Sequence, residues 1–336
     1  MRKAWLILAL LVMVFSLLAA CGAKDEEEVA GELSKRLDDL KSYKAEIQLV
    51  LKTGREPHEY DVEVWHKEPD YYRISLTNKA RDITQIILKN DDGVFVLTPH
   101  LNKSFRFQSN WPGNQPQVYL YESLIRDILS DSNRQFAVEG DQYVFDTAAN
   151  YHNKTLKHQR IWLDKDLKPT KVHLMDADFN VLVEVHFTNV EVDYTFEDDA
   201  FDIERNMQGA HRDALPAVSD EEEANEKRSL GTFYPAYQPP NVELVEEKEI
   251  AQDGEAKVVL RYAGDYHYTI IQQHAQHSKM VSMPEGQPVD LGFAVGVMSD
   301  RSLIWTYEGV DFWLTGDLPK EEMVAIAQSM AGQADK

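Results

Sequence analysis

Apolar and polar residues alternate along most of the N-terminal half of this chain. In "YKAEIQLVLKTG" the alternating apolar positions are Ala45, Ile47, Leu49 and Leu51, and "HEYDVEVWHK", "YYRISLTN" and "KSFRFQS" repeat the pattern. A period of two residues predicts β-strands with one face against an apolar surface. The Asp-Gly pair in "QIILKNDDGVFVL" predicts a hairpin turn. Together these stretches predict a meandering antiparallel sheet.

Two segments change to helical spacing. Residues 30–41, "AGELSKRLDDLK", place Leu33, Leu37 and Leu40 on one side, and "QVYLYESLIRDILSD" does the same with Leu124 and Ile128. Strands resume in "RQFAVEGDQYVFDTA" and continue to residue 193, with turns at Asp164-Lys165-Asp166 and Asp176-Ala177-Asp178. Because two helices are few for so long a sheet, either the sheet curls on itself or it leaves a groove. We expect residues 30–205 to form one α+β domain.

A second unit is expected at residues 230–336. Residues 206–229 have little apolar periodicity and an acidic cluster, which predicts a linker, with a surface helix over 220–228 as the alternative. Beyond them, "AKVVLRYAG", "YHYTIIQQHA", "GFAVGVMS", "SLIWTYEG" and "VDFWLTGD" read as strands. "LPKEEMVAIAQSM" reads as a closing helix with Pro319 in its first turn. These elements predict a small C-terminal α+β domain.

The only cysteine of the chain, Cys21, ends an apolar run that begins at Ala4 and follows Arg2 and Lys3. This layout is typical of a secretory signal peptide. Leu18-Ala19-Ala20-Cys21 resembles the bacterial lipobox, which implies cleavage after residue 20, lipidation of Cys21 and a short charged tether over residues 21–29. The alternative is an uncleaved transmembrane anchor, since the run is near the lower length limit for a span. We therefore expect a protein held by lipid at the outer face of the cell membrane, with no thiol left for a disulfide, a metal or redox chemistry.

Charge excludes further classes. The formal net charge is −22, and removal of Arg2 and Lys3 makes it −24. A chain this acidic lacks the basic face that nucleic acid needs and would gain nothing electrostatically from anionic lipids.

No catalytic motif stands out. The chain has no G-x-S-x-G, no H-E-x-x-H and no phosphate-binding loop. His274 and His277 could share a helix face, but they follow a strand, and acidic pairs such as Asp176 and Asp178 fit turns better than glycosidase sites. We therefore expect no enzyme activity, no metal site and no cofactor. Trp111-Pro112-Gly113 is expected at a loop apex, either as a contact point or as a packed turn.

Three stretches carry a family resemblance: "IWLDKDLKPTKVHLMDADFNVLVEVHFTNVEVD", "FEDDAFDI" and "GVDFWLTGDLPKEEMVAIAQSM". The first two resemble the late strands and closing segment of the LolA/LolB lipoprotein carriers and of the MucB/RseB regulators that share their fold. The third resembles a small domain found on extracytoplasmic proteins of spore-forming Gram-positive bacteria. The whole chain is similar to the LolA-like lipoproteins linked to sporulation and germination.

This resemblance implies a curved antiparallel half-barrel with covering helices, whose concave apolar face could hold acyl chains or an apolar segment of a partner. The inward set would be Ile47, Leu49, Val62, Val64, Ile74, Leu76 and Phe105. For each of them the alternative is ordinary core packing. Because an anchored protein cannot shuttle, we expect a partner-binding or regulatory lipoprotein of envelope or spore assembly, with a lipid or lipoprotein carrier or receptor as the alternative.

Overall fold

The computed structural model describes residues 24–52, 57–108, 111–112, 117–151, 153, 155–209, 231–252, 255–275, 281–291 and 293–330. Cys21, His277, Gly113 and the predicted linker from residue 210 onward lie outside these residues. Within the described residues, no helix has the length and apolar character needed to cross a membrane.

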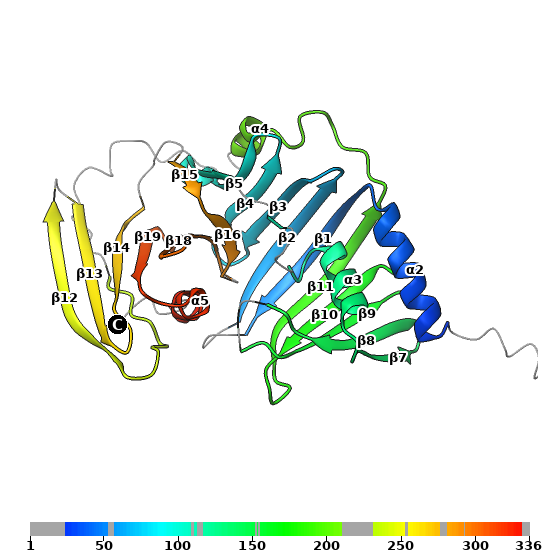
Figure 1. The fold of residues 1–336 in the computed structure, drawn as a ribbon. Helices are drawn as coiled ribbons and strands as arrows, with labels where there is room; N and C mark the ends of the chain where they lie inside the picture. The colour runs from blue at the N-terminus through cyan, green and yellow to red at the C-terminus, as the bar shows by residue number, and fades with distance from the viewer. Residues whose placement is uncertain are drawn as a thin grey trace, which may run out of the picture.

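The first domain is built on a curved sheet that Figure 1 shows with helices α2 and α3 on one side of it. Its strand order is β15-β6-β5-β4-β3-β2-β1-β11-β10-β9-β8-β7. The strands of the first domain are β1 (Ser42–Leu51), β2 (His58–Lys67), β3 (Tyr71–Asn78), β4 (Ile83–Asn90), β5 (Gly93–Thr98), β6 (Lys103–Gln108), β7 (Gln135–Glu139), β8 (Gln142–Ala148), β9 (His158–Leu163), β10 (Pro169–Met175) and β11 (Val181–Val192). All pairings among these strands are antiparallel, as the alternating pattern predicts. The predicted meander is therefore confirmed.

Helices α2 (Glu26–Asp39) and α3 (Tyr121–Ser130) cover part of the sheet, and α4 (Ile203–Gly209) and the single turn η1 (Pro99–Leu101) complete the domain. Helix α2 begins earlier than the apolar spacing predicts, so residues 26–29 lie in a helix and not in an extended tether. The reason is local: the Asp25 side chain accepts a hydrogen bond from the Glu28 backbone N–H at 2.9 Å, and Glu28 reaches back to the Asp25 N–H at 3.3 Å. This reciprocal cap satisfies N–H groups that the first turn leaves unpaired. Helix α4 was not predicted and occupies the start of the expected linker.

Helix α3 carries a largely buried carboxyl group, Asp127, beside Gln159 and Tyr151. Burial raises the pKa of Asp127 to about 6, from 3.8, and the two neighbours oppose the shift. Because the folded-state pKa lies above the unfolded value, the protonated form stabilises the fold below about pH 4, and this contribution is lost as the pH rises through 6.

Asp127→Asn is therefore expected to raise the free energy of unfolding by about 1–3 kcal/mol at pH 7.5, and to change it little at pH 4, because a shift of one unit is about 1.4 kcal/mol. Urea unfolding of the variant and the wild type at both pH values measures this difference. Asp166→Asn, in an exposed turn, is the control and should change the free energy of unfolding by less than about 0.5 kcal/mol at pH 7.5. A gain for Asp127→Asn that is equal at both pH values would contradict the account.

The second domain is a smaller sheet of order β12-β13-β14-β19-β18-β17-β16, closed by one helix. Its elements are β12 (Val242–Gln252), β13 (Glu255–Gly264), β14 (Tyr268–His274), β15 (Val281–Glu285), β16 (Gln287–Asp290), β17 (Val295–Met298), β18 (Ser302–Tyr307), β19 (Val310–Gly316) and α5 (Lys320–Ser329). The five strands and the helix predicted from the sequence are present. Strands β12, β15 and β16 were not predicted.

Strand β15 leaves its own domain and joins the large sheet. It runs parallel to β6, with Val281 opposite Phe105 and Ser282 opposite Arg106. In Figure 1 the orange β15 lies at the upper edge of the large sheet, and β6, which carries no label there, lies between it and β5. One cluster of buried apolar residues extends from Leu33 of α2 to Ile326 of α5. The predicted α+β class, with open antiparallel sheets and a small second domain, is thus confirmed, and the two domains are packed together.

Trp111 is not an exposed loop apex. Its side chain is buried and meets the Tyr72 ring edge-on, with the ring centroids 6.0 Å apart. A large aromatic ring next to the sheet gains more from burial than from exposure. Of the two alternatives, the packed turn is the one that the structure has.

Candidate functional site at the junction of the two domains

The seven residues predicted to line an apolar groove lie on one face of the sheet. Ile47 of β1 is opposite Val62 of β2, and Val62 is opposite Leu76 of β3. Val64 is opposite Ile74 in the neighbouring row. All seven belong to the shared core, and none is more than 8% exposed. In this structure the protein's own side chains cover them.

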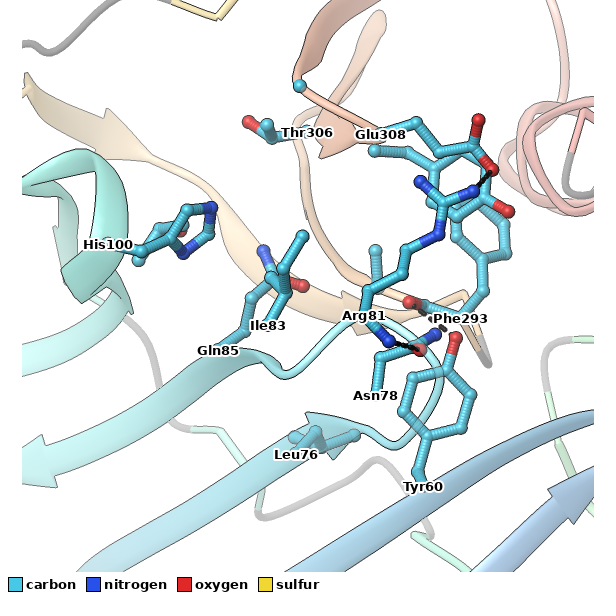
Figure 2. A pocket seen from close by; sticks show the side chains of 14 residues that line it. Tyr60, Leu76, Asn78, Arg81, Ile83, Gln85, His100, Phe293, Thr306 and Glu308 are labelled. Atoms are coloured by element: carbon cyan, nitrogen blue, oxygen red, sulfur yellow. Dashed lines mark hydrogen bonds and ion pairs between the residues drawn. The ribbon is translucent and has the colours of Figure 1, made fainter. Parts of the chain in front are cut away.

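The second domain packs against one end of strands β2 to β6. Tyr60 and Gln85 come from the first domain at this end, and a segment around Phe293 together with the β18–β19 hairpin comes from the second (Figure 2). Lys103 of the first domain also reaches the second domain, where it contacts Asp311. The hairpin turn consists of Glu308 and Gly309, with φ of 53° and 74°. A two-residue turn with positive φ at both positions matches the twist of the strands, so it presents Glu308 in a fixed direction.

Hydrogen bonds join the two domains across this junction. The Tyr60 hydroxyl donates to the Phe293 carbonyl oxygen at 2.8 Å, and the Val295 N–H donates to Gln85 Oε1 at 3.0 Å. Both bonds are buried. Buried backbone groups that lose their partners are costly, so these side chains fix the register between the domains.

Ion pairs also connect the two domains at this junction. Figure 2 shows the Arg81 guanidinium directed at the Glu308 carboxylate, with which it pairs, and the same guanidinium lies over the Tyr307 ring, 5.6 Å from its centroid. Deeper in the junction, Lys103 Nζ is 2.7 Å from Asp311 Oδ1, and these two side chains are only 5% and 4% exposed. The Thr306 hydroxyl also donates to Asp311 Oδ1, at 2.6 Å. A charge this deeply buried depends on its partner, because water cannot replace the lost contact.

The cavity between the domains is small. It measures about 40 Å³ and is lined by residues of both domains, among them Asn78, His100 and Thr306. A water molecule needs roughly 10–15 Å³ by this measure, so the cavity has room for a few waters and not for an acyl chain. Among the described residues, no three His, Cys, Asp or Glu side chains gather into a set that could hold a metal ion. The arrangement is suited to holding two domains together.

A second polar cluster lies under α3. The Tyr43 hydroxyl donates to Glu122 Oε2 at 2.7 Å, and the His66 ring packs between Tyr43 and Tyr72. Burial lowers the pKa of His66, so this imidazole is neutral at pH 7 despite the nearby Glu122 carboxylate. The cluster ties the first turn of α3 to β1, β2 and β3.

Sequence reasoning missed the residues of the junction. Lys103 and Asp311 are 208 positions apart, and nothing in a single sequence pairs them. The Glu308-Gly309 dipeptide is the one local signal, since it marks a tight hairpin turn. It indicates a turn and says nothing of the domain that the turn faces.

Comparison with known proteins gives a full-length relative. The chain is 41% identical, over 340 residues, to "Sporulation protein YdcC" of Bacillus subtilis (strain 168), and the match covers 100% of this chain and 99% of the relative. The model of the "Sporulation protein YdcC-like" family matches residues 1–201, and a "Domain of unknown function (DUF4367)" matches residues 233–330.

Among solved structures, MucB in complex with MucA(peri) covers 91% of this chain and 98% of its own, at 13% identity and a TM-score of 0.31. The CwlD amidase from Clostridioides difficile in complex with the GerS lipoprotein matches 52% of this chain and 98% of its own, at 16% identity and a TM-score of 0.28. Scores of this size establish no residue-by-residue equivalence.

The open antiparallel sheets, with a second domain packed against the end of the first, define the class as a two-domain α+β protein. Within that class, the chain belongs to the family of YdcC-like sporulation proteins. The resemblance to sporulation-associated proteins is thereby confirmed.

Proposed function

We propose that this protein binds another protein during spore formation, at the outer face of the membrane to which Cys21 anchors it by lipid. The full-length similarity to a sporulation protein supports a role in spore formation. The lipobox-like sequence before Cys21 supports the anchor and the location.

The junction is the observation that carries the proposal. Two domains that moved freely would have to be ordered when a partner binds, and that ordering weakens binding. Here the Lys103–Asp311 pair, two buried hydrogen bonds and a shared sheet hold the domains in one arrangement. A fixed arrangement presents a preformed surface from both domains, which suits protein recognition.

Lipid carriage is the second candidate. The one-sided apolar face that includes Ile47, Val62 and Leu76 favours it, because such a face in an open half-barrel could hold acyl chains. A lipid would have to displace side chains that are already buried there. For that reason we rank partner binding first and assign no catalytic residue.

The test is chemical cross-linking of the full-length chain in its own sporulating cells. A membrane-permeable, cleavable cross-linker is applied before and during sporulation, and the chain is then purified under denaturing conditions. We expect one envelope protein to be joined to the chain at high yield during sporulation only. Cross-links spread evenly over abundant proteins at both stages would contradict partner binding.

A further inference from the structure

Two hairpin turns of the first domain have the same construction. In one, the Asp164 N–H donates to the Lys168 carbonyl oxygen and the Lys168 N–H donates back to Asp164 Oδ1, both at 2.9 Å. In the other, the Asp176 N–H donates to the Asn180 carbonyl oxygen at 3.1 Å, and the Asn180 N–H donates to Asp176 Oδ1 at 2.9 Å. Each aspartate thus closes its turn in the same way.

Both turns place an apolar residue in the left-handed region. Leu167 has φ of 60° and Phe179 has φ of 63°. Glycine or asparagine is favoured there, because the Cβ of other residues crowds the backbone. A bulky side chain in this conformation is rare enough to need a reason.

For Leu167 the reason is burial. Its side chain is 1% exposed, and its carbonyl oxygen accepts a hydrogen bond from the Tyr121 hydroxyl at 2.7 Å. Core packing and the link to α3 offset the backbone strain. This turn therefore serves the fold.

Phe179 is not buried in this way. Its side chain is 64% exposed, the largest value among the exposed large apolar residues of the described chain. Its ring stacks on His158, with the centroids 4.1 Å apart and the planes at 12°, so the ring is held in place while much of it faces water. A strained backbone and an exposed aromatic ring are both unfavourable for folding, which leaves a role outside the fold as the explanation.

We infer that Phe179 is the aromatic anchor through which this protein docks on its protein partner; this inference rests on the proposed function. Aromatic rings that enter a partner's pocket dominate the binding energy of many interfaces, and a ring already held in position loses little freedom on binding. The same turn carries Asp176 and the exposed Asp178, and hydrogen bonds from Asn180 hold the pKa of Asp176 below its usual value, so that it stays charged.

The partner site that fits is an apolar pocket whose rim carries lysine or arginine. The two carboxylates in the same turn as the ring would pair with such a rim. The same carboxylates, on a chain of formal charge −22, would be repelled by an anionic membrane, which argues against a lipid surface as the occupant.

The first part of the test separates the anchor from the fold. Phe179→Asn is expected to keep or raise the melting temperature of the full chain, because asparagine suits the left-handed position. Leu167→Asn, the matched change in the twin turn, is expected to lower it, because the core loses a buried side chain. A clear fall in melting temperature for Phe179→Asn would mean that Phe179 supports the fold, and would overturn the inference.

The second part locates the contact in sporulating cells. Photoreactive p-benzoylphenylalanine replaces Phe179 in one strain and Lys165, at an exposed place in the twin turn, in another. We expect a photo-cross-link from position 179 to one apolar, basic-rimmed segment of one protein, and none from position 165. With the chemical cross-linker described above, Phe179→Asn should capture at least tenfold less of that protein than the wild type does.

Capture of the same partner by wild type and Phe179→Asn alike would overturn the anchor and leave the proposed function standing. A wild-type chain that captures no partner would overturn both. The third readout is co-sedimentation of the chain, without the lipid proposed on Cys21, with phosphatidylglycerol vesicles. Binding that Phe179→Asn abolishes would show a membrane anchor and overturn the assignment of a protein pocket.

Discussion

Asp311→Ala is expected to lower the free energy of unfolding by about 3–5 kcal/mol, the range for breaking one side of a buried ion pair. The substitution leaves the Lys103 ammonium group without its carboxylate at a position where the side chain is 5% exposed. It also removes the acceptor of the Thr306 hydroxyl. Guanidinium chloride unfolding, followed by tryptophan fluorescence, measures the change. Trp305, which stacks on Phe312 in the second domain, contributes to this signal together with the other tryptophans of the chain.

Two further variants make the result specific. Lys103→Met combined with Asp311→Leu removes both charges and should recover most of the lost stability, since an apolar pair of similar volume is often as stable as a buried ion pair. Asp300→Ala breaks the exposed pair with Lys320, whose side chains are 87% and 42% exposed, and should cost less than about 1 kcal/mol. Equal losses in the free energy of unfolding for Asp311→Ala and Asp300→Ala would show that the Lys103–Asp311 pair does not hold the two domains together.

Cys21→Ala is expected to move the protein from the membrane fraction to the soluble extracytoplasmic fraction. Each buried methylene group of a lipid chain contributes about 0.8 kcal/mol, and stable anchoring takes two chains or one chain with a second signal. If the chain is cleaved before Cys21, its formal charge is near −24, and electrostatic attraction to anionic lipids would not supply that second signal. Loss of the thiol would then release it.

The measurement is fractionation of cells that express the wild type or the variant, together with metabolic labelling by a fatty-acid analogue. Lys24→Ala, three residues away, is the control and should stay in the membrane with its label. If the wild type itself carried no label and kept the size of the uncleaved chain, the apolar run from Ala4 to Ala20 would be an uncleaved anchor.

Local patterns predicted much of the fold. Alternation of apolar residues found the strands of the meander, and the apolar spacing around Leu124 and Ile128 found α3. The twin aspartate turns were also visible, because an aspartate that closes its own turn does so through neighbouring residues. In each case the information lies within a few positions of the chain.

What the sequence could not show depends on distant contacts. The segment "VSMPE" that becomes β15 contains Pro284 and has no strand pattern of its own; it becomes a strand only because the edge of β6 accepts it. Distant contacts also decide the pairing of Lys103 with Asp311. They likewise decide why Leu167 is buried and Phe179 is exposed, although the two turns are built alike. The predicted groove residues lie on one face of the sheet, and their role in holding a ligand stays a prediction.

Native mass spectrometry of the mature chain, purified gently from the envelope of its own sporulating organism, tests the central claim most directly. We expect the chain to carry a second protein in a defined stoichiometry and no extractable mass of several hundred daltons beyond the lipid on Cys21. A chain without a protein partner that carries a further mass of that size, lost on solvent extraction, would contradict the account and show that the apolar face holds lipid.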